Sequence, residues 1–471
     1  MSWLEISLAL ITAVIILGYM SGVLMIGRRI FTALGVGTLM LGLQLVRDGY
    51  RIQMLLFYLL FAVSLLSFTA WALWRRTVKL EKKPRLWKRI TVGGIGTVIL
   101  AIAFLIPLYV LPIITLPMPT GTHIIGTSSY NWIDESRLES FTSDEADHRD
   151  VLVRVWYPAE PIENMKTASY AYNVEQMEQL YNDQPLYVKV LLDAIKNTKV
   201  HSYLQVPVSS VASRYPVLLM SPGFGASNFM YTSFTENLAS HGYIVVAIEH
   251  PYYTQIPTIY PDGRITAGQV ALDADPFMWD NMSEHMQLWA QDVRFVLNQL
   301  YVLNESKDQN ILSGKMDLNR IGMLGHSFGG AAAAQVMHQD SRVLAGLNMD
   351  GFPYGAAIED GLTNPFLYIQ TTDSDAFGKR ELSEDVWSDS KKYPGLESEE
   401  EYFEAAAEYT RRKNGMLKNG GSEWVVSGAD HMSFSDTVLY SPLLGDGDLS
   451  LIETINEKLV QFFDVHVKTI E

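Results

Sequence analysis

Apolar residues follow two different patterns along this chain, and the change between them divides it into two parts. Four long apolar runs fill most of the first 117 residues, near 6–26, 31–46, 52–74 and 90–112. A helix needs roughly 20 apolar residues to cross the hydrocarbon core of a bilayer. Three runs reach that length, while the second holds 16 residues and several glycines. The pattern predicts a bundle of about four transmembrane helices, in which the second run either spans, packs as a tight interior helix or forms a re-entrant segment.

From residue 118 to residue 471 the apolar runs are short and alternate with helical stretches. Seven of them are predicted as strands: 150–157, 215–223, 243–249, 320–324, 343–349, 365–372 and 423–426. Apolar strands that alternate with helices indicate a mostly parallel sheet with helices on both faces, which assigns this part to the α/β class. Two segments interrupt the alternation, 169–208 and 399–417. Each is predicted to form either a lid over a ligand site or ordinary surface helices.

Charge divides the chain at the same place, near Pro117. Residues 1–117 hold 12 Lys and Arg against three acidic residues, a net charge of +9. Residues 118–471 hold 24 Lys and Arg against 49 acidic residues, a net charge of −25. Negative charge of this size repels phosphate backbones, so nucleic acid is excluded as a partner of the second part.

Basic residues also predict how the chain is oriented in a cell membrane. Eight Lys and Arg lie between the third and fourth apolar runs, within residues 75–89. Because Lys and Arg gather in short cytoplasmic loops, the fourth helix is expected to deliver residues 118–471 to the outside. The first run does not resemble a typical signal peptide, since residues 1–5 lack a basic side chain and more apolar runs follow. No disulfide supports the exported part, because the chain has no cysteine, but about 350 residues can form a stable core without one.

A glycine-rich motif, Gly325-His326-Ser327-Phe328-Gly329, lies between a predicted strand and a helix of small residues. The pattern G-x-S-x-G at such a junction is typical of a nucleophile elbow, which exposes a serine hydroxyl on a sharp, strained turn. Glycine is needed two residues before and after the serine, because a Cβ there would collide with the neighbouring strand or helix. The motif makes Ser327 a candidate catalytic nucleophile.

A serine nucleophile of this kind needs an acid and a histidine, which follow it along the chain in that order. Two histidines come after any suitable acid. His431 directly follows a predicted strand, whereas His466 lies in a terminal helix whose apolar spacing indicates packing, so His431 is the predicted base. Asp350 and Asp373 each end a predicted strand. The residues alone leave the choice between these two acids open.

The negative oxygen of a tetrahedral intermediate needs preorganised hydrogen-bond donors. One is commonly the backbone NH of the residue after the nucleophile, here Phe328, and another comes from the loop after an earlier strand. The glycine-rich loop 221–225 follows a predicted strand and makes the Phe224 NH the best candidate for the second donor. The alternative is that this loop is a plain Gly-Pro turn. The predicted chemistry needs no metal and no organic cofactor.

Five motifs resemble those of one known family: Gly325-His326-Ser327-Phe328-Gly329-Gly330, Met349-Asp350-Gly351, His431-Met432-Ser433-Phe434-Ser435-Asp436, Ser221-Pro222-Gly223-Phe224-Gly225 and Leu238-Ala239-Ser240-His241-Gly242. Over about residues 153–436 the chain resembles the secreted type of platelet-activating factor acetylhydrolase, a family of α/β hydrolases. Its acid follows the strand immediately after the elbow helix, so the resemblance favours Asp350. Its members are calcium-independent and remove short or oxidised acyl groups from the middle position of glycerophospholipids, and the resemblance implies such a reaction here.

The chain departs from the family in two places. After residues 247–250 the family has a charged pair, whereas this chain has Pro251-Tyr252-Tyr253, which implies a different pocket wall. Segment 169–208 does not align with the family on its motifs, and an insertion there would reshape the selection of acyl chains. His326 is expected to pack or hydrogen-bond beneath the elbow, and His250 either lines the pocket or supports it from behind.

The leading hypothesis is a membrane-anchored serine ester hydrolase that acts outside the cell on short acyl esters, including phospholipids. One alternative is a broad carboxylesterase or lipase that the anchor merely retains at the surface. Another alternative, of a different class, is a membrane-bound sensor with a catalytically silent domain. The oligomeric state does not follow from the sequence.

Overall fold

The computed structural model describes residues 2–21, 28–77, 86–105, 114–181, 183, 185–268, 279–307, 310–379, 396, 398–441 and 447–469. The chain forms two compact units. The first comprises Met1–Ile114, Met177–Thr198 and Tyr440–Leu443, and the second comprises Thr115–Gln176, Lys199–Leu439 and Leu444–Glu471. The middle of the segment predicted as a first lid therefore belongs to the first unit.

The first unit consists mainly of helices, and all four apolar runs are helical where the structure describes them. The helices are α1 (Trp3–Ser21), α2 (Arg28–Arg47), the short turn η2 (Ile52–Met54), α3 (Leu55–Thr77), α4 (Leu86–Leu105) and α6 (Leu186–Asn197). Two apolar clusters hold the first four long helices together. Leu8, Leu34 and Phe61 join α1, α2 and α3. Ala9, Phe57 and Leu100 join α1, α3 and α4.

One helix in the described residues is long and apolar enough to cross a membrane, and it is Ile30–Arg47 of α2. The other three helices contribute shorter apolar stretches of 10–17 residues, Trp3–Gly18, Leu55–Ala70 and Gly94–Leu105. Among the described residues, the second run, which is the shortest in the sequence, thus provides the longest apolar stretch. The arrangement with four spans stays a prediction. Residues 78–85, which carry half of the basic cluster used to predict orientation, lie outside the described residues.

The second unit is built on a sheet of nine strands in the order β3-β1-β2-β5-β4-β6-β7-β8-β9. The strands are β1 (Ile124–Leu138), β2 (His148–Ala159), β3 (Ser202–Leu204), β4 (Tyr215–Ser221), β5 (Ile244–Glu249), β6 (Met316–His326), β7 (Val343–Met349), β8 (Phe366–Thr371) and β9 (Ser422–Val426). β2 pairs antiparallel with β1 and β5, and the other pairs are parallel. The predicted mostly parallel sheet is confirmed.

Two strands were not expected from the sequence. β1 contains Ser128, Ser129, Asn131 and Asp134, and its burial pattern does not alternate cleanly. A strand near the edge of a sheet contacts the core with few residues, so its apolar signal is weak. The other missed strand, β3, is three residues long and pairs only with β1.

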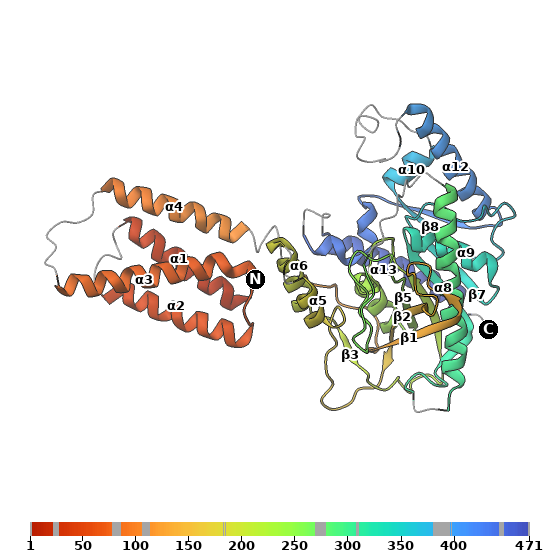
Figure 1. Ribbon diagram of the computed structural model, residues 1–471, viewed down its shortest axis with the longest axis horizontal. Helices are drawn as coiled ribbons and strands as arrows, with labels where there is room; N and C mark the ends of the chain where they lie inside the picture. Colours follow the sequence, from red (N-terminus) through yellow and green to blue (C-terminus); the bar gives the residue numbers. More distant parts are fainter. Residues whose placement is uncertain are drawn as a thin grey trace. The chain divides into compact units, whose positions relative to one another are not determined.

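Helices cover both faces of the sheet (Figure 1). They are α7 (Thr232–Ser240), α8 (Trp279–Glu305), α9 (Phe328–Gln339), α10 (Thr372–Lys379), α12 (Glu399–Leu417) and α13 (Leu449–Phe463), with the short turns η4 (Asn228–Tyr231), η5 (His431–Phe434) and η6 (Asp436–Leu439) and the π-helical turn η7 (Asp464–Lys468). Helix α5 (Val174–Leu180) is divided between the two units. α8 packs beside α9 on one face, and α7 packs beside α13 on the other. Phe463 of α13 lies against Gly322 of β6, where a larger residue would collide with it.

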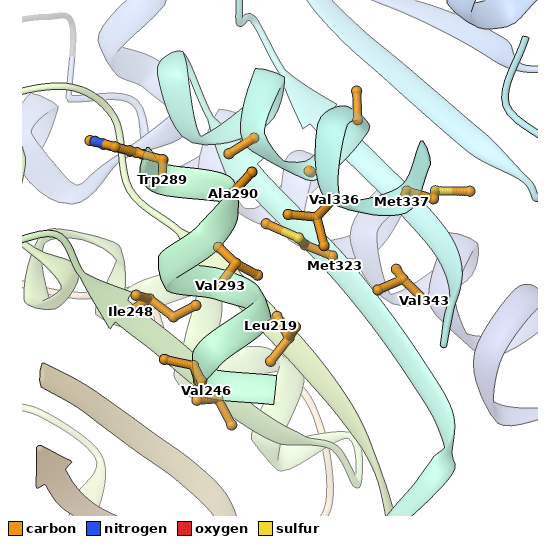
Figure 2. Close-up of a cluster of buried hydrophobic side chains, with 14 of the residues drawn as sticks. Leu219, Val246, Ile248, Trp289, Ala290, Val293, Met323, Val336, Met337 and Val343 are labelled. Atoms are coloured by element: carbon orange, nitrogen blue, oxygen red, sulfur yellow. The ribbon is translucent and has the colours of Figure 1, made fainter. Parts of the chain in front are cut away.

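The main core lies between the sheet and helices α8 and α9. An apolar stripe of α8, including Met286, Trp289 and Val293, is buried. Figure 2 shows Trp289 and Val293 gathered with Leu219 of β4 and Ile248 of β5. This packing fixes the strands in register. The loops at their carboxyl ends therefore meet at one edge, where such sheets hold their ligand sites.

Candidate active site

Ser327 stands between β6 and α9 on the strand-to-helix turn that the motif predicts. Its backbone has φ 54° and ψ −122°, a conformation that residues other than glycine rarely adopt. A Cβ on Gly325 would collide with the backbone of Gly329, and a Cβ on Gly329 would collide with the carbonyl groups of Ser221 and Pro222. Both glycines are thus required by close backbone contacts, and the turn presents the serine at the edge of the sheet.

His431 opens the short turn η5 after β9. Asp430 caps this turn, because its side chain accepts a hydrogen bond from the Ser433 NH while the Ser433 side chain accepts one from the Asp430 NH. His431 Nε2 lies 3.0 Å from Ser327 Oγ, and its side chain is 48% exposed. The base expected from the sequence is therefore within hydrogen-bond distance of the candidate nucleophile and open to solvent.

Asp350 directly follows β7 with a φ of 54°. Its Oδ2 lies 2.8 Å from His431 Nδ1, and its Oδ1 accepts a hydrogen bond of 2.9 Å from the Thr371 NH. Asp373 lies exposed in the first turn of α10. Of the two acids that the sequence left open, Asp350 is thus the one whose carboxylate is hydrogen-bonded to His431, and its second oxygen is held by the end of the neighbouring strand.

The two predicted oxyanion donors are backbone NH groups close to Ser327. Phe328 opens α9, and the first NH groups of a helix have no acceptor within it. In the loop after β4, the Gly223 NH donates to the Tyr231 hydroxyl and the Gly225 NH donates to the Tyr253 carbonyl. Among the described residues no acceptor is found for the Phe224 NH between them. Both predicted donors are thus available to a ligand.

His326 lies beneath the elbow, as expected from the sequence, and it is buried. Its Nε2 lies 2.8 Å from the His431 carbonyl oxygen, which can only accept, so Nε2 carries the proton. Its Nδ1, 2.8 Å from the Tyr231 hydroxyl, then accepts a hydrogen bond from it. Burial, followed by the charge of His431, lowers the pKa of His326 well below its usual value, so the ring stays neutral. Tyr231, which was missed from the sequence, thereby connects the 221–225 loop to His431.

The ends of the first segment predicted as a lid, and the whole of the second, belong to the second unit. Tyr170, at the start of the first, donates to Asp436 Oδ2 across 3.0 Å, and the Ser202 NH donates to Glu236 across 2.8 Å. The second segment coincides with helix α12, where Lys413 pairs with Glu423 of β9 at 2.6 Å. Their role as lids stays a prediction. In the described part of the chain, no three His, Asp or Glu side chains are grouped as metal ligands.

Comparison with known proteins identifies the family of this chain. Residues 111–264 and 289–447 match the profile of "Platelet-activating factor acetylhydrolase, isoform II". The chain belongs to this family. A protein of Arthroderma benhamiae named "Probable 1-alkyl-2-acetylglycerophosphocholine esterase" is 37% identical over 161 residues, which cover 33% of this chain and 37% of that protein. The platelet-activating factor acetylhydrolase of Cavia porcellus is 22% identical over 277 residues, which cover 55% of this chain and 60% of that protein. The chain thus spans less than two thirds of the length of either relative.

A solved structure shares the fold. A ferulic acid esterase from Streptomyces cinnamoneus superimposes with a TM-score of 0.56 over 76% of this chain and 94% of its own length, at 24% sequence identity. At this identity the likeness shows the fold alone. Together with the observed strand order, it confirms the α/β-hydrolase fold that the platelet-activating factor acetylhydrolase family resemblance implied.

Proposed function

We propose that this protein is a serine ester hydrolase that removes short acyl groups, including those at the middle position of glycerophospholipids. The observation that carries the proposal is the hydrogen-bonded series Ser327–His431–Asp350, at 3.0 and 2.8 Å, on a strained turn open to solvent. Membership in the platelet-activating factor acetylhydrolase family supports the class of substrate. The roles of the individual residues follow from the geometry and from the known logic of such triads.

In the proposed mechanism His431 Nε2 takes the proton of Ser327 while the serine oxygen bonds to the ester carbonyl carbon. Asp350 holds the Nδ1 proton of His431 and stabilises the imidazolium that forms. The Phe328 and Phe224 NH groups donate to the negative oxygen. Collapse of this intermediate transfers the proton from His431 to the departing alcohol and leaves an acyl-serine. Water, deprotonated by the same histidine, then releases the acid and restores Ser327.

We also propose that residues 1–117 form an integral membrane region that keeps residues 118–471 outside the cell. All four of its long helices expose apolar side chains: Ile6, Leu10, Val14, Leu17, Val36, Leu39, Leu43, Leu59, Val63, Leu66, Ile95, Val98 and Ile102. Helices that are apolar both inside and outside a bundle are typical of a bilayer environment. An anchor of this kind would hold the site beside an insoluble substrate.

The catalytic proposal is tested with full-length protein purified in detergent. p-Nitrophenyl esters from acetyl to lauroyl and a phospholipid with a mid-position acetyl group are the substrates, and a fluorophosphonate is the covalent probe. Rapid cleavage of the short esters and of the acetylated phospholipid supports the proposal. Preference for long acyl chains would favour the lipase alternative. Folded protein that neither turns over nor labels would favour the silent sensor.

The membrane proposal has a clean test because the chain has no cysteine. A single cysteine replaces Met118, which is 71% exposed, and intact cells are treated with a maleimide that cannot cross membranes. Labelling of Met118→Cys in intact cells, together with retention in membranes after alkaline extraction, is the expected result. Labelling only after lysis would contradict the proposed orientation.

A further inference from the structure

A second series of serine, histidine and aspartate lies in the second unit, away from the one described above. Ser221 ends β4, and its Oγ lies 3.0 Å from His250 Nε2. His250 follows β5, and its Nδ1 lies 3.0 Å from Oδ2 of Asp292, which comes from α8. All three residues are 0% exposed. The hydrogen-bond pattern equals that of the candidate triad, but no substrate can reach this serine.

Charges around Asp292 fix the direction of these hydrogen bonds. Burial by itself would raise the pKa of Asp292, but Arg149 and the hydrogen bond from His250 hold it below its usual value. Arg149 contacts both carboxylate oxygens, at 3.1 and 2.7 Å, and Arg137 adds a third contact at 2.9 Å. Burial lowers the pKa of His250, so the ring is neutral with its proton on Nδ1 beside the carboxylate. The Ser221 hydroxyl therefore donates to His250 Nε2.

This buried series touches the segments that carry both oxyanion donors. Ser221 directly precedes the loop of Phe224, and the backbone of Ser221 packs against Gly329 in the first turn of α9. On its other side the His250 ring stacks on Trp289, with ring centroids 3.8 Å apart and planes at 13°. Trp289 in turn meets the Phe328 ring edge-on at 4.9 Å. His250 thus contacts Ser221, which precedes the loop of the Phe224 NH, and Trp289, which packs against Phe328.

We propose that Ser221, His250 and Asp292 are positioning residues that set the Phe224 and Phe328 NH groups for the oxyanion. The inference rests on the proposed function, because an oxyanion forms only if Ser327 attacks an ester. An oxyanion donor acts through distance, and complete removal of one donor lowers kcat by about 10²–10³-fold in enzymes of this kind. Loss of the Ser221–His250 hydrogen bond loosens the donors without removing them. Its effect falls on the transition state, hence on kcat, and spares KM.

The test compares full-length Ser221→Ala with wild type on p-nitrophenyl acetate. We expect kcat to fall about tenfold, which is less than the loss for a missing donor, and KM to change by less than about twofold. A trifluoromethyl ketone, which forms a tetrahedral adduct with a serine nucleophile, should lose affinity in parallel with kcat. Ser240→Ala in α7 is the matched control, since it also removes a buried, hydrogen-bonded serine hydroxyl, and it should leave all three quantities unchanged.

A second variant approaches the same hydrogen bond from the histidine. In His250→Asn the shorter amide still donates to Asp292, so the carboxylate stays paired, but nothing reaches Ser221. If both variants act through one hydrogen bond, the kcat of the double variant is no lower than that of the single variant with the lower kcat. A wild-type rate in Ser221→Ala, or losses that multiply in the double variant, would overturn the positioning role. Wild-type protein without any esterase activity would overturn the proposed function itself.

Discussion

The two Ser–His–Asp series of this protein have nearly the same hydrogen-bond geometry and opposite surroundings. In one, His431 lies 3.0 Å from Ser327 and 2.8 Å from Asp350. In the other, both contacts of His250 measure 3.0 Å. The side chain of His431 is 48% exposed, whereas that of His250 is 1% exposed. Hydrogen bonds between the three residue types therefore do not by themselves mark a reactive site.

Backbone conformation and charge separate the two series further. Ser327 has a positive φ on a turn, whereas Ser221 is the last residue of a strand and pairs in register with Gly325. The acid of the buried series is also held by two arginines, Arg137 and Arg149. A nucleophile must be exposed to its substrate, and the strained turn places the Ser327 hydroxyl at a site that is open to solvent. The buried series is closed and fully paired, which suits it to hold other groups in place.

The sharpest way to separate the two series is covalent labelling. We expect Ser327→Ala to lose hydrolysis by at least about 10⁴-fold and to lose all reaction with a fluorophosphonate, because Ser221 cannot replace it. Peptide mass spectrometry of labelled wild-type protein should place the phosphonate on Ser327. A phosphonate found on Ser221 would break the distinction.

The next largest effect separates Asp350 from Asp373, the two acids between which the sequence did not decide. Asp350→Asn should lower kcat by about 10³–10⁴-fold, because an amide can no longer hold the Nδ1 proton of His431. Asp373→Asn is the matched control and should stay within about twofold of wild type. Both rates are measured on p-nitrophenyl acetate with circular dichroism as the check on folding. A full loss in Asp373→Asn alone would make the proposed triad wrong.

The acid of the buried series should matter for stability. Asp292→Asn leaves the buried Arg149 with one acid, Glu139, and removes the carboxylate that it contacts twice. Breaking a buried ion pair from one side costs about 3–5 kcal/mol in the free energy of unfolding. Denaturant titration measures this value. The comparison fails if Asp292→Asn unfolds at the same denaturant concentration as wild type.

The smallest expected effect concerns pH. Burial lowers the pKa of His250, so below pH 6.5 the unfolded chain binds a proton there that the folded chain does not. The free energy of unfolding therefore falls as the pH falls below 6.5, by at most about 1.4 kcal/mol per pH unit for this one group. His250→Asn has no such proton, so its stability relative to wild type should rise between pH 6.5 and 5.5. A constant difference would show that His250 is charged in the folded protein.

Much of the second unit followed from local patterns. The parallel strands, the elbow at Ser327 and the position of His431 directly after a strand were expected because each depends on neighbours in the chain. β1 was missed because polar residues such as Ser129 and Asn131 interrupt its apolar pattern. The residues alone left the choice between Asp350 and Asp373 open, although the family resemblance favoured Asp350, and the fold places the Asp350 carboxylate on His431 while Asp373 lies in α10.

The buried series escaped the sequence analysis, although one sign of it was visible. Asp292 lies on the face of α8 that Trp289 and Val293 mark as core, and a charged residue at a core position indicates a buried partner. The partner could not be named, since Arg149 lies 143 residues away along the chain. The same holds for Tyr231, which meets His326 from a different element.

By itself the sequence determined the seven strands from β2 to β9 other than β3 and the strained turn that carries Ser327. These depend on periodicity, glycine positions and charge, which act over a few residues. Tertiary structure alone decided which of two similar Ser–His–Asp series faces solvent and which acid reaches His431. The physical reason is that access and burial depend on contacts between segments far apart in the chain, such as α8 with β5 and β7 with η5. Local patterns do not record those contacts.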